Sequence, residues 1–455
     1  MSTEVINPAT GEKIRNYEEL SVNEAFEAVD KTHQVWQQWR NTTFNERSRY
    51  MLNAARILRE EKEKWGQLMT AEMGKVTKSG IAEAEKCAWV CEYYANNAER
   101  FLQIEEVETD ASKSFISYQP IGVVLAIMPW NFPFWQVLRF AAPALMAGNA
   151  GVLKHASNVP GCGKAIEEIF KRAGFPEHLF TTLLVGSDKV NDIIGHEKIR
   201  AVTLTGSTPA GQAVAARAGE LLKKTVLELG GSDPYVVLAD ADLEATVEAC
   251  VTSRLINTGQ SCIAAKRFIV VKELKAQFES MMVEKMKSKV LGDPSDNQTD
   301  LGPMARADLR DDLHEQVRQS MDAGAKCLLG GEVPKGKGAF YPATVLTDVK
   351  PGMPAYDNEL FGPVAAIIEA LDERDAIRIA NDTSFGLGAA VFTRNEQKGK
   401  HIAEYELEAG SCFVNSFVKS DPRLPFGGIK ESGYGRELGV FGIREFVNIK
   451  TVYIK

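Results

Sequence analysis

The stretch Thr203-Leu-Thr-Gly-Ser-Thr-Pro-Ala-Gly211 runs from an apolar strand candidate into a helix candidate. Gly206 supplies the turn, and Pro209 suits the first turn of a helix, where its missing N–H is not needed. The free N–H groups at such a helix N-terminus favour an anion. The stretch has neither G-x-G-x-x-G nor the lysine of a G-x-x-x-x-G-K-[ST] loop, so Ser207 and the helix would meet a pyrophosphate by a different route.

Short apolar runs on both sides of this stretch alternate with segments of helical pattern. The first series of strand candidates is 123–127, 150–153, 182–185, 201–204 and 226–229. The second series is 235–238, 268–271, 364–368, 389–392 and 411–414. Alternation of strands and helices predicts parallel sheets covered by helices. We therefore expect an α/β fold of two units, with the chain crossing between them at residues 228–232.

The two ends of the chain have other patterns. From about Asn23 to Phe101, apolar residues recur at spacings of three and four, which predicts three long helices. Cys87 and Cys91 would be buried on one face of such a helix. Residues 446–454 are typical of a strand, which would pair either with a neighbouring subunit or with its own chain.

Composition and charge restrict the class of protein. A chain of 455 residues is too long for one ordinary core and indicates two or three domains. The net charge is −8, with Lys and Arg scattered among Asp and Glu, so nucleic acid is not an expected partner. No leader and no apolar run of about 18 residues is apparent, so we expect neither export nor membrane insertion. Seven dispersed cysteines suit reduced thiols in the cytoplasm better than disulfides or a metal site.

Asn257-Thr-Gly-Gln-Ser-Cys262 places one cysteine after a glycine-containing turn that follows a helical segment. Such a position can expose a thiol at a cleft, and a reactive thiol is a nucleophile toward carbonyl groups. A lone cysteine is more often a small buried residue. On this stretch alone, both interpretations of Cys262 stay open.

Two further segments supply partners for a nucleophilic thiol. Glu228-Leu-Gly-Gly231 puts a carboxylate at a strand end, where it suits a general base for Cys262 and for a later water. Pro129-Trp-Asn-Phe-Pro133 holds Asn131 at the carboxyl end of the preceding strand, where its amide suits an oxyanion donor. The simpler alternatives are a solvated or salt-bridged Glu228 and a structural Asx turn at Asn131.

Taken in their order along the chain, these motifs resemble those of the aldehyde dehydrogenase superfamily. The resemblance extends from residues 7–11 to the C-terminus. It depends most on four segments, Leu227–Gly231, Gly259–Cys262, Glu359–Pro363 and Pro425–Gly433. Within the superfamily, the chain is most similar to bacterial succinate-semialdehyde dehydrogenases, particularly at residues 128–139, 154–158 and 419–430.

The resemblance implies an aldehyde dehydrogenase-like α/β fold, with two parallel-sheet α/β domains and a small β oligomerisation element. The implied division is a cofactor-binding domain at 1–101 and 121–229, a catalytic domain at 230–432, and the oligomerisation element at 102–120 and 433–455. This element would combine a β-hairpin near 102–120 with the C-terminal strand. A homodimer or homotetramer is implied as well.

The resemblance also implies roles for the site residues. Cys262 would attack an aldehyde, and Asn131 and the Cys262 backbone amide would hold the oxyanion. After hydride transfer to a nicotinamide, Glu228 would activate the hydrolytic water. The positions that match cofactor contacts are Trp130, Lys154, Ser157, Gly206, Ser207, Glu359 and Phe361. Glu437 matches a proton-relay position.

One departure from the superfamily's pattern concerns the cofactor. The common Lys-x-x-Glu at the adenine ribose is here Lys154-His-Ala-Ser157. A glutamate there accepts hydrogen bonds from a free 2′-hydroxyl and repels a 2′-phosphate, whereas Ser157 can donate to that phosphate and Lys154 can offset its charge. We therefore predict a preference for NADP over NAD. The alternative is that Ser157 tolerates either cofactor.

Arg139 indicates the class of substrate, because it lies on a helix that leads away from Asn131. In an aromatic-lined entrance, Arg139 would bind a carboxylate on the far end of the aldehyde, with Ser420 as a helper. Ser261, next to Cys262, is a further candidate contact. Together with the resemblance, this predicts oxidation of succinate semialdehyde to succinate. The alternative for Arg139 is a surface or inter-domain salt bridge.

Other functions stay open on the sequence. A broad-specificity NAD(P)-dependent aldehyde dehydrogenase would act on other small aldehydes. A thiol hydrolase or amidase built from Cys262, Glu228 and Lys154 would leave the Thr205–Ser207 turn without a task. An inactive binding homologue would have no need to keep Asn131, Glu228 and Cys262 together. A CoA-acylating relative is a closer competitor, but Glu228 favours water as the acyl acceptor.

Overall fold

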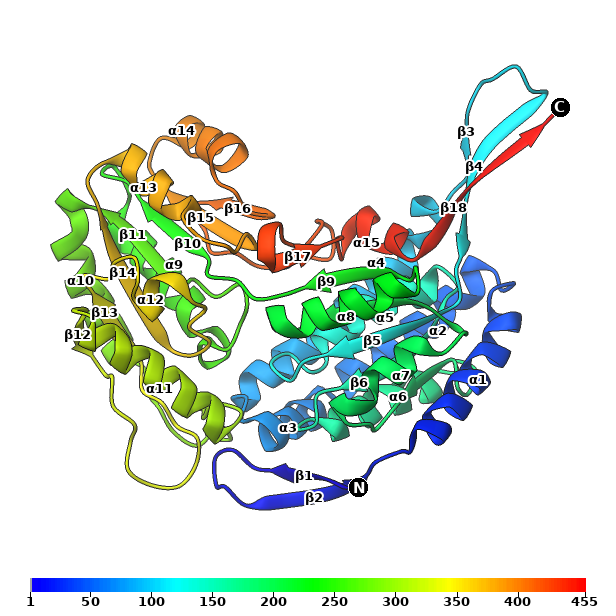
Figure 1. The fold of residues 1–455 in the computed structure, drawn as a ribbon, viewed down its shortest axis with the longest axis horizontal. Coiled ribbons are helices and arrows are strands. Elements are labelled where there is room, and N and C mark those ends of the chain that lie inside the picture. The colour runs from blue at the N-terminus through cyan, green and yellow to red at the C-terminus, as the bar shows by residue number, and fades with distance from the viewer. Residues whose placement is uncertain (1) are drawn as a thin grey trace.

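The computed structural model describes residues 2–455 and contains two large sheets in separate lobes of the molecule (Figure 1). Their central strands are largely apolar, because a parallel strand covered by helices is buried on both faces. Every residue of β10 (Pro234–Val237) and β11 (Arg267–Val271) is buried, for example. The expected α/β fold with two parallel-sheet units is confirmed.

The first large sheet has six strands in the order β17-β9-β8-β5-β6-β7. Its strands are β5 (Val123–Met128), β6 (Ala150–His155), β7 (Phe180–Thr182), β8 (Ile199–Thr205), β9 (Lys224–Glu228) and the antiparallel β17 (Gly433–Tyr434). Its helices are α5 (Trp135–Met146), α6 (Pro160–Arg172), α7 (Val190–Gly195) and α8 (Thr208–Glu220). Because β5 and β8 are parallel neighbours, the segments that contain Asn131 and Ser207 leave the sheet at the same edge.

The second large sheet has seven strands in the order β12-β13-β14-β11-β10-β15-β16. Besides β10 and β11, its strands are β12 (Lys326–Leu329), β13 (Thr344–Thr347), β14 (Val364–Ala370), β15 (Gly388–Phe392) and β16 (Ser411–Val414). Its helices are α9 (Leu243–Leu255), α10 (Lys272–Lys287), α11 (Ala307–Asp322), α12 (Pro354–Asp357), α13 (Glu373–Asn381) and α14 (Glu396–His401).

A small antiparallel sheet projects from the body of the molecule (Figure 1). It contains β3 (Glu105–Glu106), β4 (Lys113–Pro120) and β18 (Val447–Ile454), with β4 in the middle. The C-terminal strand therefore pairs with its own chain, from Val447 opposite Pro120 to Ile454 opposite Lys113. Helix α15 (Gly439–Glu445) leads into β18, and a separate hairpin pairs β1 (Ser2–Ile6) with β2 (Lys13–Glu18).

The N-terminal segment forms four helices where we expected three. They are α1 (Val22–Trp39), α2 (Phe44–Glu60), α3 (Lys62–Met73) and α4 (Thr77–Phe101). The additional break lies at Glu61, where φ is −113° and ψ is 20°. No proline or glycine marks that position, so the apolar spacing did not separate α2 from α3. Cys87 and Cys91 are both buried on α4, as their spacing predicts.

Several strands differ from the sequence-based expectation. The candidate at 182–185 overlaps the observed β7 in a single residue. The strands β12 and β13 were not predicted, and residues 433–434, assigned to the oligomerisation element, form β17 at the edge of the six-stranded sheet. β12 is a half-covered edge strand and therefore carries a weak apolar signal. β13 is buried inside the sheet, but it is only four residues long and has threonine at both ends.

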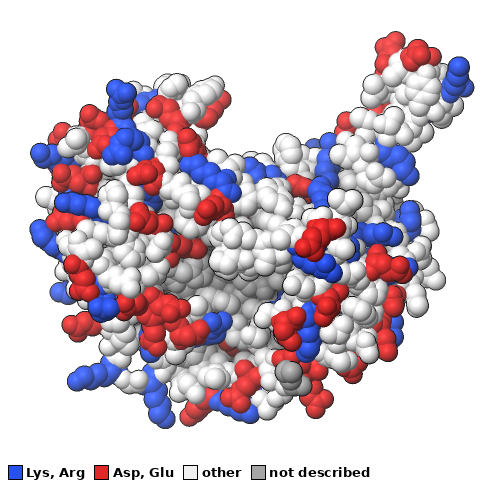
Figure 2. All heavy atoms as spheres, viewed as in Figure 1, with Lys and Arg blue, Asp and Glu red and all other residues white. Residues whose placement is uncertain are grey.

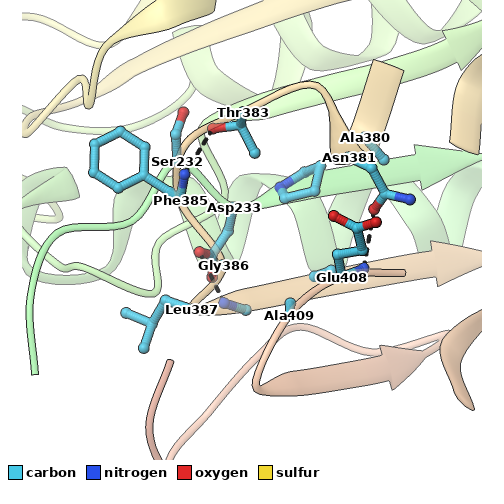
Figure 3. Close-up of a pocket in the computed structure, with 13 residues that line it drawn as sticks. Ser232, Asp233, Ala380, Asn381, Thr383, Phe385, Gly386, Leu387, Glu408 and Ala409 are labelled. Carbon is cyan, nitrogen blue, oxygen red and sulfur yellow. Dashed lines mark hydrogen bonds between the residues drawn. The ribbon is translucent and has the colours of Figure 1, made fainter. Parts of the chain in front are cut away.

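Residues 229–233 carry the chain from β9 in one large sheet to β10 in the other. Asp233 anchors this crossing, because its Oδ1 accepts a hydrogen bond from the Gly388 N–H at 3.1 Å. Figure 3 shows Asp233 beside Gly386 and Leu387. Burial raises the pKa of Asp233 to about 7, since desolvation disfavours the charged form. The crossing is thus fixed to the start of β15.

The surface carries both charges. On the face shown in Figure 2, Lys and Arg are interspersed with Asp and Glu, without a large area of one sign. Many of these charges are paired locally, such as Arg318 with Glu315 and Asp322 on α11. No helix in residues 2–455 combines the length and the apolar character that crossing a bilayer requires.

Candidate active site

Cys262 ends a strained loop between α9 and β11. Asn257, Thr258 and Gly259 have φ values of 53°, 56° and 75°, so three consecutive residues adopt left-handed conformations. A Cβ at Gly259 would lie 2.3 Å from the carbonyl oxygen of Gly362, which leaves room only for glycine. The loop is therefore packed tightly against the segment before β14, and the half-buried Cys262 lines a cavity.

Asn131 contacts the same loop from the other lobe. Its Nδ2 donates to the Gln260 carbonyl at 3.1 Å, and the Nδ2 of Asn257 donates to the Asn131 carbonyl at 2.8 Å. The Oδ1 of Asn131 has no partner among the described residues, so the side chain does not form the alternative Asx turn. The amide lies against the loop that carries Cys262 and lines the same cavity, so its position is compatible with an oxyanion donor.

A cavity of about 270 Å³ lies between the two lobes at this point. Seven of the expected site residues line it together: Trp130, Asn131, Gly206, Ser207, Cys262, Glu359 and Phe361. The rings of Trp130 and Phe361, one from each lobe, are in edge-to-face contact with centroids 5.7 Å apart. A cleft between two α/β units with convergent polar groups is typical of a ligand site.

Two walls of this cavity carry groups that suit parts of a dinucleotide. Gly206 and Ser207 line it at the N-terminus of α8, and the Ser207 side chain makes no capping hydrogen bond to that 13-residue helix. The first N–H groups of α8 therefore lack a side-chain cap and suit a pyrophosphate. On the opposite wall, a Cβ at Gly230 would lie 2.6 Å from Glu359 Oε2, so the missing side chain makes room for a carboxylate that can accept ribose hydroxyls.

Lys154 and Ser157, which we expected at the adenine ribose, do not line this cavity. Lys154 lies near the end of β6, where burial lowers its pKa. Ser157 is exposed and lines a second cavity of about 630 Å³ together with Arg306 and Arg310. The side chain at position 157 therefore faces open space, in which a phosphate group fits without displacing packed residues.

The Cys262 thiol is neutral in this environment. Burial raises its pKa to about 12. The positive charges of Lys266 and Arg139 oppose this rise, and the carboxyl groups of Glu359 and Asp233 add to it. At neutral pH the thiol is protonated, so its attack on a carbonyl needs a base that removes the proton.

This pKa predicts how Cys262 reacts with iodoacetamide. At pH values below the pKa, the thiolate fraction increases about tenfold for each unit by which the pH is raised. The rate of alkylation should therefore increase by about the same factor per pH unit from about pH 6 to 9. Mass spectrometry of the peptide that contains Cys262 measures the rate, and the fully buried Cys87 serves as the unreactive reference. A rate that levels off below about pH 8 would contradict the expectation.

Lys266, which the motifs did not indicate, binds the backbone of the loop that carries Cys262. Its Nζ donates to the carbonyl oxygens of Ser261, Cys262 and Ala264 at 3.0, 2.7 and 3.1 Å. It also forms an ion pair of 3.3 Å with Glu359 Oε1. The buried ammonium of Lys266 thus links the loop that carries Cys262 to Glu359, the residue expected to contact a ribose. The only sequence signal was a lysine directly before an apolar strand. Ser261 itself is buried and does not line the cavity.

Glu228 ends β9 and is only 2% exposed. Burial raises its pKa well above the ordinary value, Arg139 opposes the rise and Glu437 adds to it. Neither of its carboxyl oxygens has a hydrogen-bond partner among the described residues, so it is neither solvated nor salt-bridged. A Cβ at Gly427 would lie 2.7 Å from Glu228 Oε1, which places the carboxyl group against that backbone. Glu228 does not line the cavity of Cys262, although the next two residues do.

Arg139 does not line the cavity either, in contrast to our expectation. It is buried on α5, where it forms an ion pair with Glu437 and lies 4.7 Å from the ring centroid of Phe426. A buried guanidinium needs an anion to offset desolvation, and Glu437 provides it. Arg139 therefore forms a salt bridge, which was the alternative to a substrate contact, but this salt bridge is buried and not at the surface. The candidate relay residue Glu437 is held in this pair, beside Glu228.

Ser420 is also outside the cavity. It is buried in the segment that follows β16, where its Oγ accepts a hydrogen bond from Lys86 Nζ at 2.8 Å. Lys86 belongs to α4 and was not indicated by any motif. In residues 2–455, no group of three or more His, Cys, Asp or Glu side chains is arranged to hold a metal ion.

Known proteins match this chain over its whole length. The model of the aldehyde dehydrogenase family matches residues 1–452. A probable succinate-semialdehyde dehydrogenase [NADP(+)] of Synechocystis sp. is 50% identical over 454 residues, and the succinate-semialdehyde dehydrogenase [NADP(+)] of Mycobacterium leprae is 49% identical over 457 residues, with all of each chain covered. The crystal structure of succinic semialdehyde dehydrogenase from Streptococcus pyogenes in complex with NADP+ is 37% identical, covers 99% of both chains and superposes with a TM-score of 0.97.

Proposed function

Because the chain belongs to the aldehyde dehydrogenase family, we propose that it oxidises succinate semialdehyde to succinate and reduces NADP. The observation that carries this function is the cavity in which Cys262 and Asn131 meet Ser207 and Glu359. A nucleophile, an oxyanion donor and a dinucleotide-binding surface share one space, as oxidation through a covalent thioester requires. The succinate-semialdehyde dehydrogenases described above support the choice of aldehyde and cofactor.

The residues of the chain account for the covalent steps. The Cys262 sulfur attacks the aldehyde carbon, its proton leaves to a base, and the oxyanion is held by Asn131 Nδ2 and the Cys262 N–H. One such donor contributes roughly 2.7–4 kcal/mol. The thiohemiacetal anion gives up a hydride, for which a bound nicotinamide would be the acceptor, and becomes a thioester on Cys262. Glu228 then takes a proton from water, which attacks the thioester, and succinate leaves as the sulfur is restored.

The cofactor would be held by groups from both lobes. Ser207 and the N-terminus of α8 would bind the pyrophosphate, and Glu359 would accept hydrogen bonds from a ribose. Lys154 and Ser157 would meet the adenine ribose and its 2′-phosphate. When bound, the nicotinamide ring supplies the hydride acceptor.

A panel of aldehydes assayed with NADP and with NAD tests the proposed function. We expect the highest kcat/KM for succinate semialdehyde with NADP. Equal efficiency on uncharged small aldehydes would assign the broad-specificity alternative. Hydrolysis of esters or amides without any cofactor reduction would overturn the proposal in favour of a thiol hydrolase.

Replacing Ser157 with Glu is expected to raise the NAD-to-NADP ratio of kcat/KM by about 10- to 100-fold. The glutamate would repel the 2′-phosphate and accept hydrogen bonds from a free 2′-hydroxyl. Because Ser157 is exposed, the change should leave the fold intact. The same substitution at Ser288, an exposed residue at the end of α10 in the other lobe, is the matched control. An unchanged cofactor ratio in Ser157→Glu would contradict this role.

We also propose that the enzyme acts in the cytoplasm as a homodimer or homotetramer. Three apolar side chains of β18 support assembly, since Ile449, Tyr453 and Ile454 are 62%, 50% and 47% exposed. One edge of β18 is unpaired within the described chain, and a second copy could pair with it. Light scattering of the purified protein measures the assembly, and a monomer at micromolar concentration would contradict it.

A further inference from the structure

The peptide bond that precedes Cys262 is held by a buried ammonium group. Lys266 is 1% exposed, and its Nζ donates to the Ser261 carbonyl oxygen at 3.0 Å. The Ala264 N–H donates to the same oxygen at 3.2 Å. Two donors, one of them charged, therefore fix the direction of this carbonyl group and draw electron density toward its oxygen.

The other end of the same peptide is the Cys262 N–H, one of the two donors that would hold the oxyanion. The peptide is trans, so its C=O and N–H groups point in opposite directions. Because the Ser261 oxygen is bound to Lys266, the Cys262 N–H points away from Lys266. This N–H donates to no acceptor within residues 2–455, so it is available to a ligand.

The peptide that follows Cys262 is bound to the same ammonium group. Lys266 Nζ donates to the Cys262 carbonyl oxygen at 2.7 Å, so both peptides that flank the nucleophile are fixed. The other oxyanion donor, Asn131, uses one hydrogen of its Nδ2 for the Gln260 carbonyl at 3.1 Å. An amide nitrogen carries two hydrogens, and one is left for a ligand. The backbone around Cys262 thus has one fixed orientation relative to the Asn131 amide.

The charge of Lys266 is unfavourable for a merely structural contact, which a neutral donor could make as well. Burial lowers the pKa of Lys266, because desolvation disfavours the ammonium form, and Glu359 and Asp233 oppose this effect. Glu359 Oε1 lies 3.3 Å from the Nζ. A positive charge at this position is useful where negative charge develops, and the oxyanion is the negative charge that forms beside this loop.

We propose that Lys266 is a positioning residue for the oxyanion: it orients and polarises the Ser261–Cys262 peptide so that the Cys262 N–H donates to the oxygen of the tetrahedral adduct. This role rests on the proposed function and deepens it, because it assigns the residue that prepares one oxyanion donor. A donor lowers the barrier most when it is directed at the oxyanion before the reaction begins. Lys266 does not line the cavity, so it acts through the peptide.

Two reactions of Cys262 separate this role from an effect on the thiol itself. 4-Nitrophenyl acetate acylates the thiol through a tetrahedral adduct with an oxyanion, whereas iodoacetamide alkylates it without one. Neither reaction needs NADP, so a change at Glu359 does not enter. Lys266 opposes the rise in the pKa of Cys262, and its loss should slow both reactions through the thiolate fraction. The ratio of the two second-order rate constants cancels that common factor.

We expect Lys266→Met to lower the ratio of acylation to alkylation by about 10- to 100-fold at about pH 8. Methionine keeps an aliphatic chain and removes the charged donor. Lys266→Arg returns a charged donor and should recover part of the ratio. Lys223→Met is the matched control, because Lys223 Nζ also donates to two backbone carbonyls, those of Ile194 and His196, and lies outside the cavity. It should leave the ratio within about twofold of wild type.

An unchanged ratio in Lys266→Met, with both rate constants falling together, overturns the inference and leaves Lys266 with an effect on the thiol alone. If a thermal melt shows that Lys266→Met does not fold, Lys266→Gln replaces it, since glutamine keeps a neutral donor. Its ratio should also fall, and an unchanged ratio overturns the inference in the same way. A wild-type enzyme that is acylated but reduces no NADP with succinate semialdehyde overturns the proposed function, while the ratio still decides the role of Lys266.

Discussion

Replacing Cys262 with Ala is expected to lower kcat for aldehyde oxidation by at least about 10⁴-fold. Alanine keeps the backbone carbonyl that Lys266 binds at 2.7 Å, so the loop should retain its shape while the sulfur is lost. Without a thiohemiacetal, the oxyanion donors have no tetrahedral adduct to stabilise. The neighbouring Ser261 cannot replace the thiol, since it is buried and outside the cavity. The absorbance of NADPH measures the rate.

Cys327→Ala is the matched control for that loss. Cys327 lies on β12, outside the cavity, and its Sγ contacts the Leu329 carbonyl. Its replacement should leave kcat within about twofold of wild type. Cys262→Ala should still bind NADP in a fluorescence titration, which separates the loss of chemistry from a loss of cofactor. If kcat of Cys262→Ala falls by less than about 10⁴-fold, Cys262 is not the nucleophile.

Much of the fold could be predicted because buried parallel strands carry a strong local signal. The candidates at 123–127 and 268–271 agree with β5 and β11 to within one residue. At β12, the residues are half-covered or exposed, and a four-residue edge strand of this kind lacks an apolar run. The break at Glu61 was missed for a related reason, since helical periodicity continues through it without a glycine or proline.

A residue of the candidate site could be predicted only where a short sequence motif indicates its chemical role. Cys262 and Asn131 stand in short motifs, and the structure brings both to one cavity. Arg139 shows the limit of such reasoning, because we expected it at the substrate entrance and nothing in the sequence around it indicates the buried ion pair with Glu437. Lys86 contacts Ser420 and Trp135 through tertiary packing alone, and no local pattern distinguishes it from a surface lysine.

Replacing Glu228 with Gln is expected to lower steady-state kcat by about 10²- to 10⁴-fold. Glutamine keeps the shape of the side chain but cannot accept a proton from the hydrolytic water. The first hydride transfer does not need that water, so a burst of about one NADPH per active site should precede the slow phase. Rapid mixing with absorbance detection measures both phases. Glu404→Gln, at an exposed helical position, is the matched control and should show wild-type kinetics.

The pH dependence distinguishes the base from a merely structural carboxyl group. Burial raises the pKa of Glu228, so its ionised form becomes more abundant as the pH rises above the ordinary range of a carboxyl group. Wild-type kcat should therefore increase with pH through this titration. In Glu228→Gln the slow phase should lose that part of the profile, because no group titrates at this position.

Stability should not account for the loss of activity in Glu228→Gln. A carboxyl group whose pKa is higher in the folded than in the unfolded state costs stability once the pH exceeds its unfolded value of about 4.3, and this cost grows until the folded pKa is passed. A neutral glutamine removes the cost, so its Tm at neutral pH should not fall below that of wild type. A folded variant without a burst would assign Glu228 to the deprotonation of Cys262, and an unchanged kcat would remove Glu228 from both proton transfers.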